Sequence, residues 1–217
     1  MESVRFFAAF KYPTNNSLLE RLVALATFAN VIHVELIAVY PGGKVESIGA
    51  VQGRGVTSTS PRTDAFYELY DNIGTALNPT EATFGWKWVE ITQLLREEVC
   101  TGSMDCLEWI HSQIGKPYRN TVYLTFWVPF VKVKAFDKPS FICSELVADF
   151  LLTQGTSTDN AIRNIKEACQ FVYPIRRLFG ECGTDKLSPQ DLLQSLLSSD
   201  KVVCHSLRST QSLLECM

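Results

Sequence analysis

Apolar residues recur along the chain with two different periods, and these periods predict a mixture of strands and helices. Runs that are mainly apolar, or that alternate with polar residues, are typical of strands, and they lie at 3–10, 31–40, 44–51 and 86–92. Pro41-Gly42-Gly43 separates the second run from the third. Because this is a typical turn sequence, residues 31–51 are expected to form a β-hairpin.

Helices are predicted where apolar residues are spaced three and four positions apart, at 17–29, 62–76, 103–114 and 141–153. Ser188 and Pro189 predict the start of a further helix, because serine caps helices and proline fits the first helical position. The strands and helices do not alternate regularly, which favours an α+β fold with an antiparallel sheet over a doubly wound parallel sheet. No repeat or linker divides residues 1–217, so a single domain is expected.

The amino-acid composition argues against some kinds of binding partner. Of the 217 residues, 46% are hydrophobic and 20% are charged, as in ordinary globular domains. Lysine and arginine total 20 against 23 aspartates and glutamates, and the net charge of −3 comes without any basic run, which argues against a nucleic-acid partner. The longest apolar stretch, 22–40, contains Asn30, His33 and Glu35, so no transmembrane span is expected.

The N-terminus and the cysteines bear on localisation. The first residues lack a clear hydrophobic core and cleavage site of a signal peptide. The seven cysteines are odd in number and irregularly spaced, whereas a secreted disulfide framework is more often even. These features favour a cytoplasmic protein, either cellular or viral and acting in the host-cell cytosol.

Two short patterns that could bind a cofactor or a metal are incomplete. Gly53-Arg54-Gly55 lacks the Lys-Ser/Thr pair and the following helix of a phosphate-binding loop. Cys100 and Cys106 do not have the CxxC spacing of a zinc site, and no pair of histidines completes them. The sequence therefore predicts neither a cofactor nor a metal.

Cys143 is the first candidate for chemistry, because it lies at or near the first turn of the helix predicted at 141–153. The free N–H groups and the positive dipole end of a helix stabilise a thiolate, which is the reactive form of cysteine. The same N–H groups could also bind an oxyanion. The structural alternative is a small apolar residue in the core, which is the more usual role of a lone buried cysteine.

A reactive cysteine needs a base, and the chain offers three histidines, His33, His111 and His205. His33 lies within an apolar strand, where a polar ring needs a reason, whereas His111 lies on the polar side of its helix and His205 lies near the C-terminus. By position His33 is the best candidate. The alternative is a core histidine whose hydrogen bonds are satisfied structurally.

Five segments carry a resemblance to a known family, and they lie at 33–37, 42–45, 114–118, 141–147 and 187–192. In this order they resemble the YiiX-like permuted papain amidases of the NlpC-like group. The resemblance implies a circularly permuted papain-like fold, in which the histidine strand precedes the cysteine helix. It also implies that Cys143 attacks a carbonyl, that His33 activates it and then protonates the leaving group, and that Tyr118 lies beside the oxyanion.

The third catalytic residue, which would orient His33, is where the chain departs from the family pattern. The family often has glycine at the position of Glu35, and it tends to have an acidic residue at the position of Gly49. Glu46 is our first candidate for the orienting carboxylate, and Glu35 is the second. Glu35 shares a strand face with His33, but neighbours on one face lie about 7 Å apart, and either carboxylate could instead be a solvated strand charge.

The function that these residues indicate is that of a thiol hydrolase of Cys–His type, an amidase or protease, or of an acyltransferase with the same acyl-enzyme. The substrate is expected to be an amide, a peptide or an acyl group. If the aromatic segment at 123–133 forms an apolar wall rather than core or interface, a lipid-linked acyl group is favoured. The alternatives are a catalytically inactive papain-like scaffold that binds a partner, and a structural protein with a chance cysteine. The sequence does not set the oligomeric state.

Overall fold

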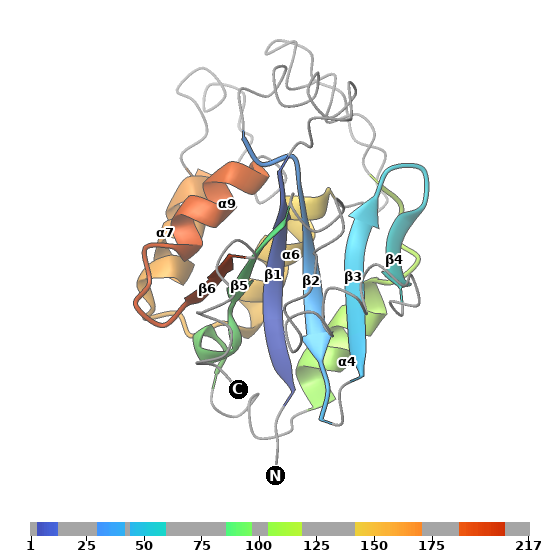
Figure 1. Ribbon diagram of the computed structural model, residues 1–217, viewed down its shortest axis with the longest axis horizontal. Helices are drawn as coiled ribbons and strands as arrows, with labels where there is room; N and C mark the ends of the chain where they lie inside the picture. The colour runs from blue at the N-terminus through green and yellow to red at the C-terminus, as the bar shows by residue number, and fades with distance from the viewer. Residues whose placement is uncertain are drawn as a thin grey trace.

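The computed structural model describes residues 4–12, 30–41, 44–59, 86–96, 104–118, 142–170 and 187–206. The helices expected at 17–29 and 62–76, and the aromatic segment at 123–133, lie outside these residues. Figure 1 shows the described parts as one sheet with helices behind it.

The sheet has six strands in the order β4-β3-β2-β1-β5-β6, and each neighbouring pair is antiparallel. The strands are β1 Arg5–Lys11, β2 His33–Val39, β3 Val45–Val51, β4 Gly55–Thr59, β5 Trp86–Glu90 and β6 Val203–Ser206. The described helices are α4 Met104–Gln113, α6 Cys143–Gln154, α7 Asn160–Gln170 and α9 Pro189–Leu196, with a short 3-10 helix at Thr92–Leu94. The predicted α+β class and its antiparallel sheet are confirmed.

Each predicted element that falls on described residues is present, with small shifts at its ends. The runs at 3–10, 31–40, 44–51 and 86–92 overlap β1, β2, β3 and β5, and β2 and β3 form the expected hairpin. The helices expected at 103–114 and 141–153 correspond to α4 and α6. Ser188 caps α9 as predicted, because its hydroxyl accepts a hydrogen bond from the Asp191 N–H over 3.1 Å. Four described elements were not predicted: β4, the 3-10 helix, α7 and β6.

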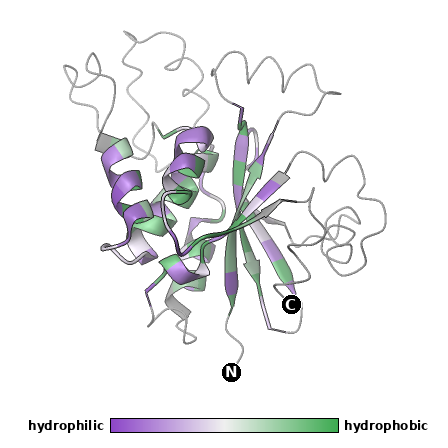
Figure 2. Cartoon of the chain, turned by 60° about the vertical axis from the view of Figure 1, so that its left-hand side comes forward, coloured by the Kyte–Doolittle hydropathy of each residue, from purple (hydrophilic) through white to green (hydrophobic). Residues whose placement is uncertain are grey.

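The two faces of the sheet bury different sets of residues. Figure 2 shows the described helices together on one side of the sheet, with hydrophobic residues turned toward it. On this side the strands and helices share the main core, which includes Phe10, Leu36, Ile48 and Phe150. A smaller buried cluster consists of Phe7, Ala9, Ile37, Val39, Val45 and Trp88. Because side chains alternate along a strand, this smaller cluster belongs to the opposite face.

The ladder between β2 and β3 is shorter than the strands themselves. It runs from Leu36 opposite Ile48 to Val39 opposite Val45. Residues 33–35 at the start of β2 and residues 49–51 at the end of β3 extend beyond it. The start of β2 therefore has backbone groups on its β3 side that the ladder does not use, and this is where the candidate site lies.

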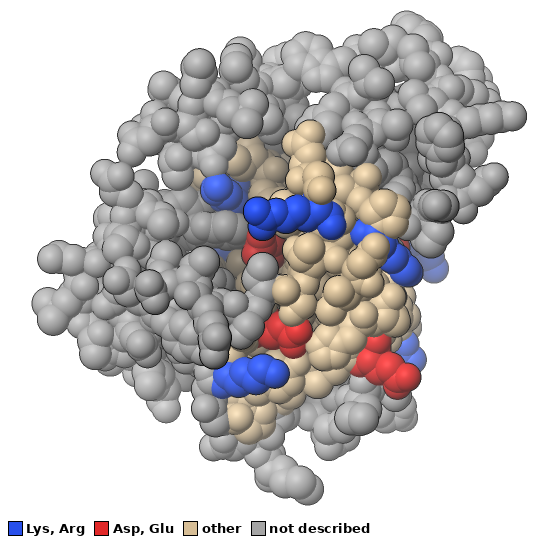
Figure 3. Space-filling model, turned by 90° about the vertical axis from the view of Figure 1, so that its right-hand side faces the viewer, with Lys and Arg blue, Asp and Glu red and all other residues tan. Residues whose placement is uncertain are grey.

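The surface of the described residues carries charges of both signs. On the face formed by β4 and α4, Lys and Arg side chains are interspersed with Asp and Glu side chains, and the part of that face that the structure describes shows no large patch of one sign (Figure 3). Within the same described ranges, no helix combines the length and the apolar character that a membrane span requires.

Candidate active site

Cys143 is the first residue of α6, as the sequence predicted for the first turn. Ile142 before it is extended, with φ −99° and ψ 166°, and its N–H donates to Glu145 Oε2 over 3.2 Å. Ser144 donates its hydroxyl to the carbonyl of Leu187 over 2.5 Å, which ties the start of α6 to the segment before α9. The position of the thiol is therefore fixed from both sides.

The surroundings of Cys143 favour its thiolate. The residue is only 6% exposed, and burial alone would raise its pKa. The charge of His33, a hydrogen bond with that side chain, and the backbone N–H groups of Val34 and Ser144 outweigh burial, so the pKa of Cys143 lies below its ordinary value. The Val34 N–H belongs to the part of β2 that extends beyond the ladder.

His33 is the first residue of β2, and its ring contacts two partners. Its Nε2 lies 3.1 Å from Glu35 Oε1. The other ring nitrogen, Nδ1, is therefore the one that can form a hydrogen bond with the thiol. Burial would lower the pKa of His33, but the charge of Cys143, the hydrogen bond to it, and the bond and charge of Glu35 raise that pKa to about 10. The two shifts have the same effect, since the lowered pKa of Cys143 favours a thiolate and the raised pKa of His33 favours an imidazolium.

Glu35 lies behind His33 and holds it through the second nitrogen. The Ser47 hydroxyl donates to Glu35 Oε2 over 2.5 Å, while Oε1 faces the imidazole. Burial would raise the pKa of Glu35, but the hydrogen bond and charge of His33, the bond from Ser47 and the charge of Lys11 lower it further than burial raises it. Neighbours on one strand face lie about 7 Å apart, but the side chains of Glu35 and His33 are long enough to form a hydrogen bond across that distance.

Glu46, the carboxylate first expected to orient His33, lies with a different histidine. Its Oε2 accepts a bond from the Tyr40 hydroxyl over 2.6 Å, its Oε1 accepts one from the Ser58 hydroxyl over 2.5 Å, and both oxygens lie 3.1 Å from His111 Nε2. The register explains this placement, because Glu46 is opposite Ala38 in the main core and faces α4. The order of preference between the two carboxylates is therefore reversed.

Gly49 makes room for the Glu35 side chain. A Cβ added at Gly49 would lie 2.9 Å from Glu35 Cγ and 3.3 Å from its Cδ and Oε1. Extending the β2–β3 register by one residue places Glu35 opposite Gly49. The Glu35 side chain thus packs directly over Gly49, and any residue larger than glycine at position 49 would displace it.

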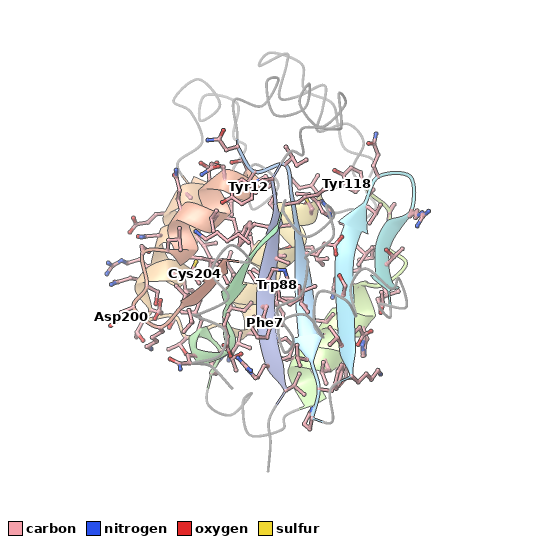
Figure 4. All side chains as sticks on the ribbon, viewed as in Figure 1. Phe7, Tyr12, Trp88, Tyr118, Asp200 and Cys204 are labelled. Carbon is pink, nitrogen blue, oxygen red and sulfur yellow. The ribbon has the colours of Figure 1, made fainter. Side chains whose placement is uncertain are left out.

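Tyr118 lies after α4 and packs, half-buried, against the main core. The backbone before it is pinned to β4, because the Gly115 N–H donates to the Val56 carbonyl over 2.9 Å and the Val56 N–H donates to the Lys116 carbonyl over 2.8 Å. Figure 4 shows Tyr118 at the end of the sheet where β2 begins. Its place beside an oxyanion stays a prediction.

Ser47 is the site residue that the sequence did not single out. A serine beside a glutamate in a strand carries no signal by itself, although its position on the same face as Val45 places a polar side chain among apolar ones. In the described ranges, no three His, Cys, Asp or Glu side chains lie close enough together to hold a metal ion.

Comparisons with protein-family models, with curated proteins and with solved structures found no match for this chain. The interpretation of the site therefore depends on the geometry of Cys143, His33 and Glu35, and on the resemblance of the sequence segments that carry them.

Proposed function

We propose that this protein is a cysteine-dependent hydrolase or acyltransferase, with Cys143 as nucleophile, His33 as general base and acid, and Glu35 as the residue that orients His33. The observation that carries the proposal is the hydrogen bond between Cys143 at the first position of α6 and His33, whose Nε2 lies 3.1 Å from Glu35 Oε1. A thiol is activated when it contacts a base that in turn contacts an orienting group. Cys143, His33 and Glu35 form such a series, called here the row.

The chemistry follows from the charges of this row. The Cys143 thiolate attacks the carbonyl carbon, and the carbonyl oxygen becomes an oxyanion near the start of α6, where the positive end of the helix dipole favours negative charge. When the carbonyl re-forms, the bond to the leaving group breaks and His33 supplies the proton that this group needs. His33 then removes a proton from water or from another acceptor, which attacks the acyl-enzyme and releases Cys143.

The departure from the family pattern supports this assignment when it is considered with the register. By resemblance, glycine is expected at position 35 and a carboxylate at position 49, whereas the chain has Glu35 and Gly49. These positions face each other across β2 and β3, and Gly49 leaves the space that Glu35 uses. We interpret this as an exchange of the carboxylate between facing strands within a permuted papain-like fold formed by residues 1–217.

The substrate class is that of acyl transfer to a thiol: an amide, a peptide or an acyl group, including a lipid-linked one. Whether the acyl group passes to water or to another acceptor is set by what reaches the acyl-enzyme. A cytoplasmic location suits this chemistry, because a reducing compartment keeps such a thiol free.

The test is alkylation of each cysteine by iodoacetamide as a function of pH, followed by peptide mass spectrometry. Cys169 is a matched internal control, because it is 7% exposed against 6% for Cys143 but lies at the C-terminal end of α7, where the helix dipole disfavours a thiolate. Cys143 is expected to label faster than Cys169 at pH 7, and with a midpoint below the ordinary value for a thiol, about 8.5.

The variant His33→Ala separates the proposal from its alternative. Because the charge of His33 and its hydrogen bond hold the thiolate, the substitution is expected to move the Cys143 midpoint to higher pH and leave Cys169 unchanged. Slow labelling of Cys143 that does not respond to His33→Ala would favour a catalytically inactive papain-like scaffold that binds a partner. If the expected response is found, acyl probes with amide, ester and long-chain leaving groups define the substrate.

A further inference from the structure

We propose that Ser47 is a fourth member of this row, a positioning residue that fixes the Glu35 carboxylate against His33. The inference rests on the proposed function and extends it to a residue that the reaction never touches.

The two oxygens of Glu35 are divided between two partners. The Ser47 Oγ–H donates to Oε2 over 2.5 Å, and Oε1 faces His33 Nε2 over 3.1 Å. A glutamate held at one oxygen can still rotate about its terminal torsion, which is broad. Contacts at both oxygens fix the plane of the carboxylate, and Ser47 therefore sets the direction in which Oε1 points.

The surroundings of Ser47 would otherwise favour an apolar residue. Ser47 is 3% exposed and lies opposite Ile37, in the same strand as the buried Val45. A buried hydroxyl is costly unless it is hydrogen-bonded. The Glu35 carboxylate accepts that bond, and bonds to an ionised acceptor are roughly twice as strong as neutral ones.

The effect of Ser47 reaches the thiol through two charges. Its hydroxyl stabilises the ionised form of Glu35, the ionised carboxylate stabilises the imidazolium of His33, and the imidazolium stabilises the thiolate of Cys143. Removal of the Ser47 hydroxyl should therefore raise the pKa of the Cys143 thiol.

Ser58 provides a matched control in the same sheet. Its hydroxyl donates to Glu46 Oε1 over 2.5 Å, and Glu46 lies 3.1 Å from His111 Nε2. Serine, glutamate and histidine are thus arranged as in the candidate site, but Cys143 takes no part. Ser58→Ala removes the same kind of hydrogen bond without touching the row that ends at the thiol.

The experiment measures the pH profile of Cys143 alkylation in the wild-type protein, in Ser47→Ala and in Ser58→Ala. Ser47→Ala is expected to label about 3- to 10-fold more slowly on the acid side of the profile, because a rise of one unit in a pKa lowers the thiolate fraction there about tenfold. Ser58→Ala is expected to lower the melting temperature while its Cys143 profile matches the wild type.

A second pair of variants guards against loss of folding. Ser47→Thr and Ser47→Val have side chains of matching shape, both suited to a strand, and only threonine keeps the hydroxyl. The threonine variant is expected to retain the wild-type profile, and the valine variant to shift as alanine does.

Two results would overturn the role of Ser47 alone: a low wild-type midpoint that neither Ser47→Ala nor Ser47→Val changes, or an equal shift in Ser58→Ala. A wild-type midpoint at the ordinary thiol value, insensitive to His33→Ala, would instead overturn the proposed function and this inference with it.

Discussion

Gly49→Ala is the substitution whose effect can be worked most directly from the structure. The new Cβ would lie 2.9 Å from Glu35 Cγ, whereas ordinary contacts begin at 3.4 Å, so the side chain of Glu35 must move by the difference of 3.4 and 2.9, or 0.5 Å. A movement of that size away from His33 would lengthen the Nε2–Oε1 distance from 3.1 Å to about 3.6 Å, which is too long for a hydrogen bond.

The expected result is a selective loss of thiol reactivity. With Glu35 displaced, the imidazolium loses its second partner, and Cys143 alkylation at pH 7 is expected to fall about tenfold, within the range that small misplacements cause. Alanine suits the backbone of Gly49, whose φ is not in the left-handed region, so any loss of stability is expected to come from the displaced contacts of Glu35 with His33 and Ser47. The assay combines the alkylation profile with a thermal melt.

Gly53→Ala is the matched control, since it makes the same chemical change at the β3–β4 turn. Gly53 has φ +79° and nothing within 4 Å of an added Cβ, so alanine there strains the backbone, at a cost of about 1–2 kcal/mol, without touching Glu35. The reasoning would be refuted by a wild-type alkylation profile in Gly49→Ala, or by an equal loss of reactivity in Gly53→Ala.

Three further predictions test the same site. The rate of acyl transfer should rise as the pH passes the lowered pKa of Cys143 and fall as it passes the His33 pKa of about 10. The fall is expected because the imidazolium that protonates the leaving group is lost above that pH. A pH–rate profile that already falls near pH 6.5 would contradict the raised pKa of His33. Glu35→Gly and Gly49→Glu should each reduce Cys143 labelling, while the double variant should recover most of it, as judged by labelling at pH 7; no recovery would argue against exchange between the facing strands. Glu46→Ala should lower the free energy of unfolding in urea by about 1–3 kcal/mol, because the half-buried hydroxyls of Tyr40 and Ser58 lose their acceptor, yet leave the Cys143 profile unchanged. A shifted profile would connect Glu46 to the site.

Local signals were sufficient for much of the fold. The hairpin of β2 and β3 combines two apolar runs with a Pro-Gly-Gly turn, and the helix that starts at Pro189 combines a serine cap with proline at the first position. α7 was missed although Ala161, Ile162 and Ile165 have helical spacing and the Asp159 carboxylate accepts from the Ala161 N–H. β6 has only four residues. β4 is as long as β5, but its sequence from Gly55 to Thr59 has a single apolar side chain, Val56, where β5 has an apolar and aromatic run.

The sequence indicated individual residues of the site, but not the hydrogen bonds that connect them. Position in a helix singled out Cys143, and a polar ring in an apolar strand singled out His33. The choice between Glu35 and Glu46 depended on register and on side-chain reach, which spacing along the chain does not encode. Ser47 depended on both, because it is adjacent to Glu35 only through the pairing of β2 with β3.

The short ladder between β2 and β3 has a consequence for how this site can be studied and how it can vary. The Val34 N–H beside the thiolate is a main-chain group, so it persists for every residue at position 34 except proline, which has no N–H. Alanine scanning would report only on core packing there and would miss the electrostatic role. Replacing the amide with an ester by chemical synthesis would remove that donor alone. Other apolar residues at position 34 are therefore expected to leave this donor in place.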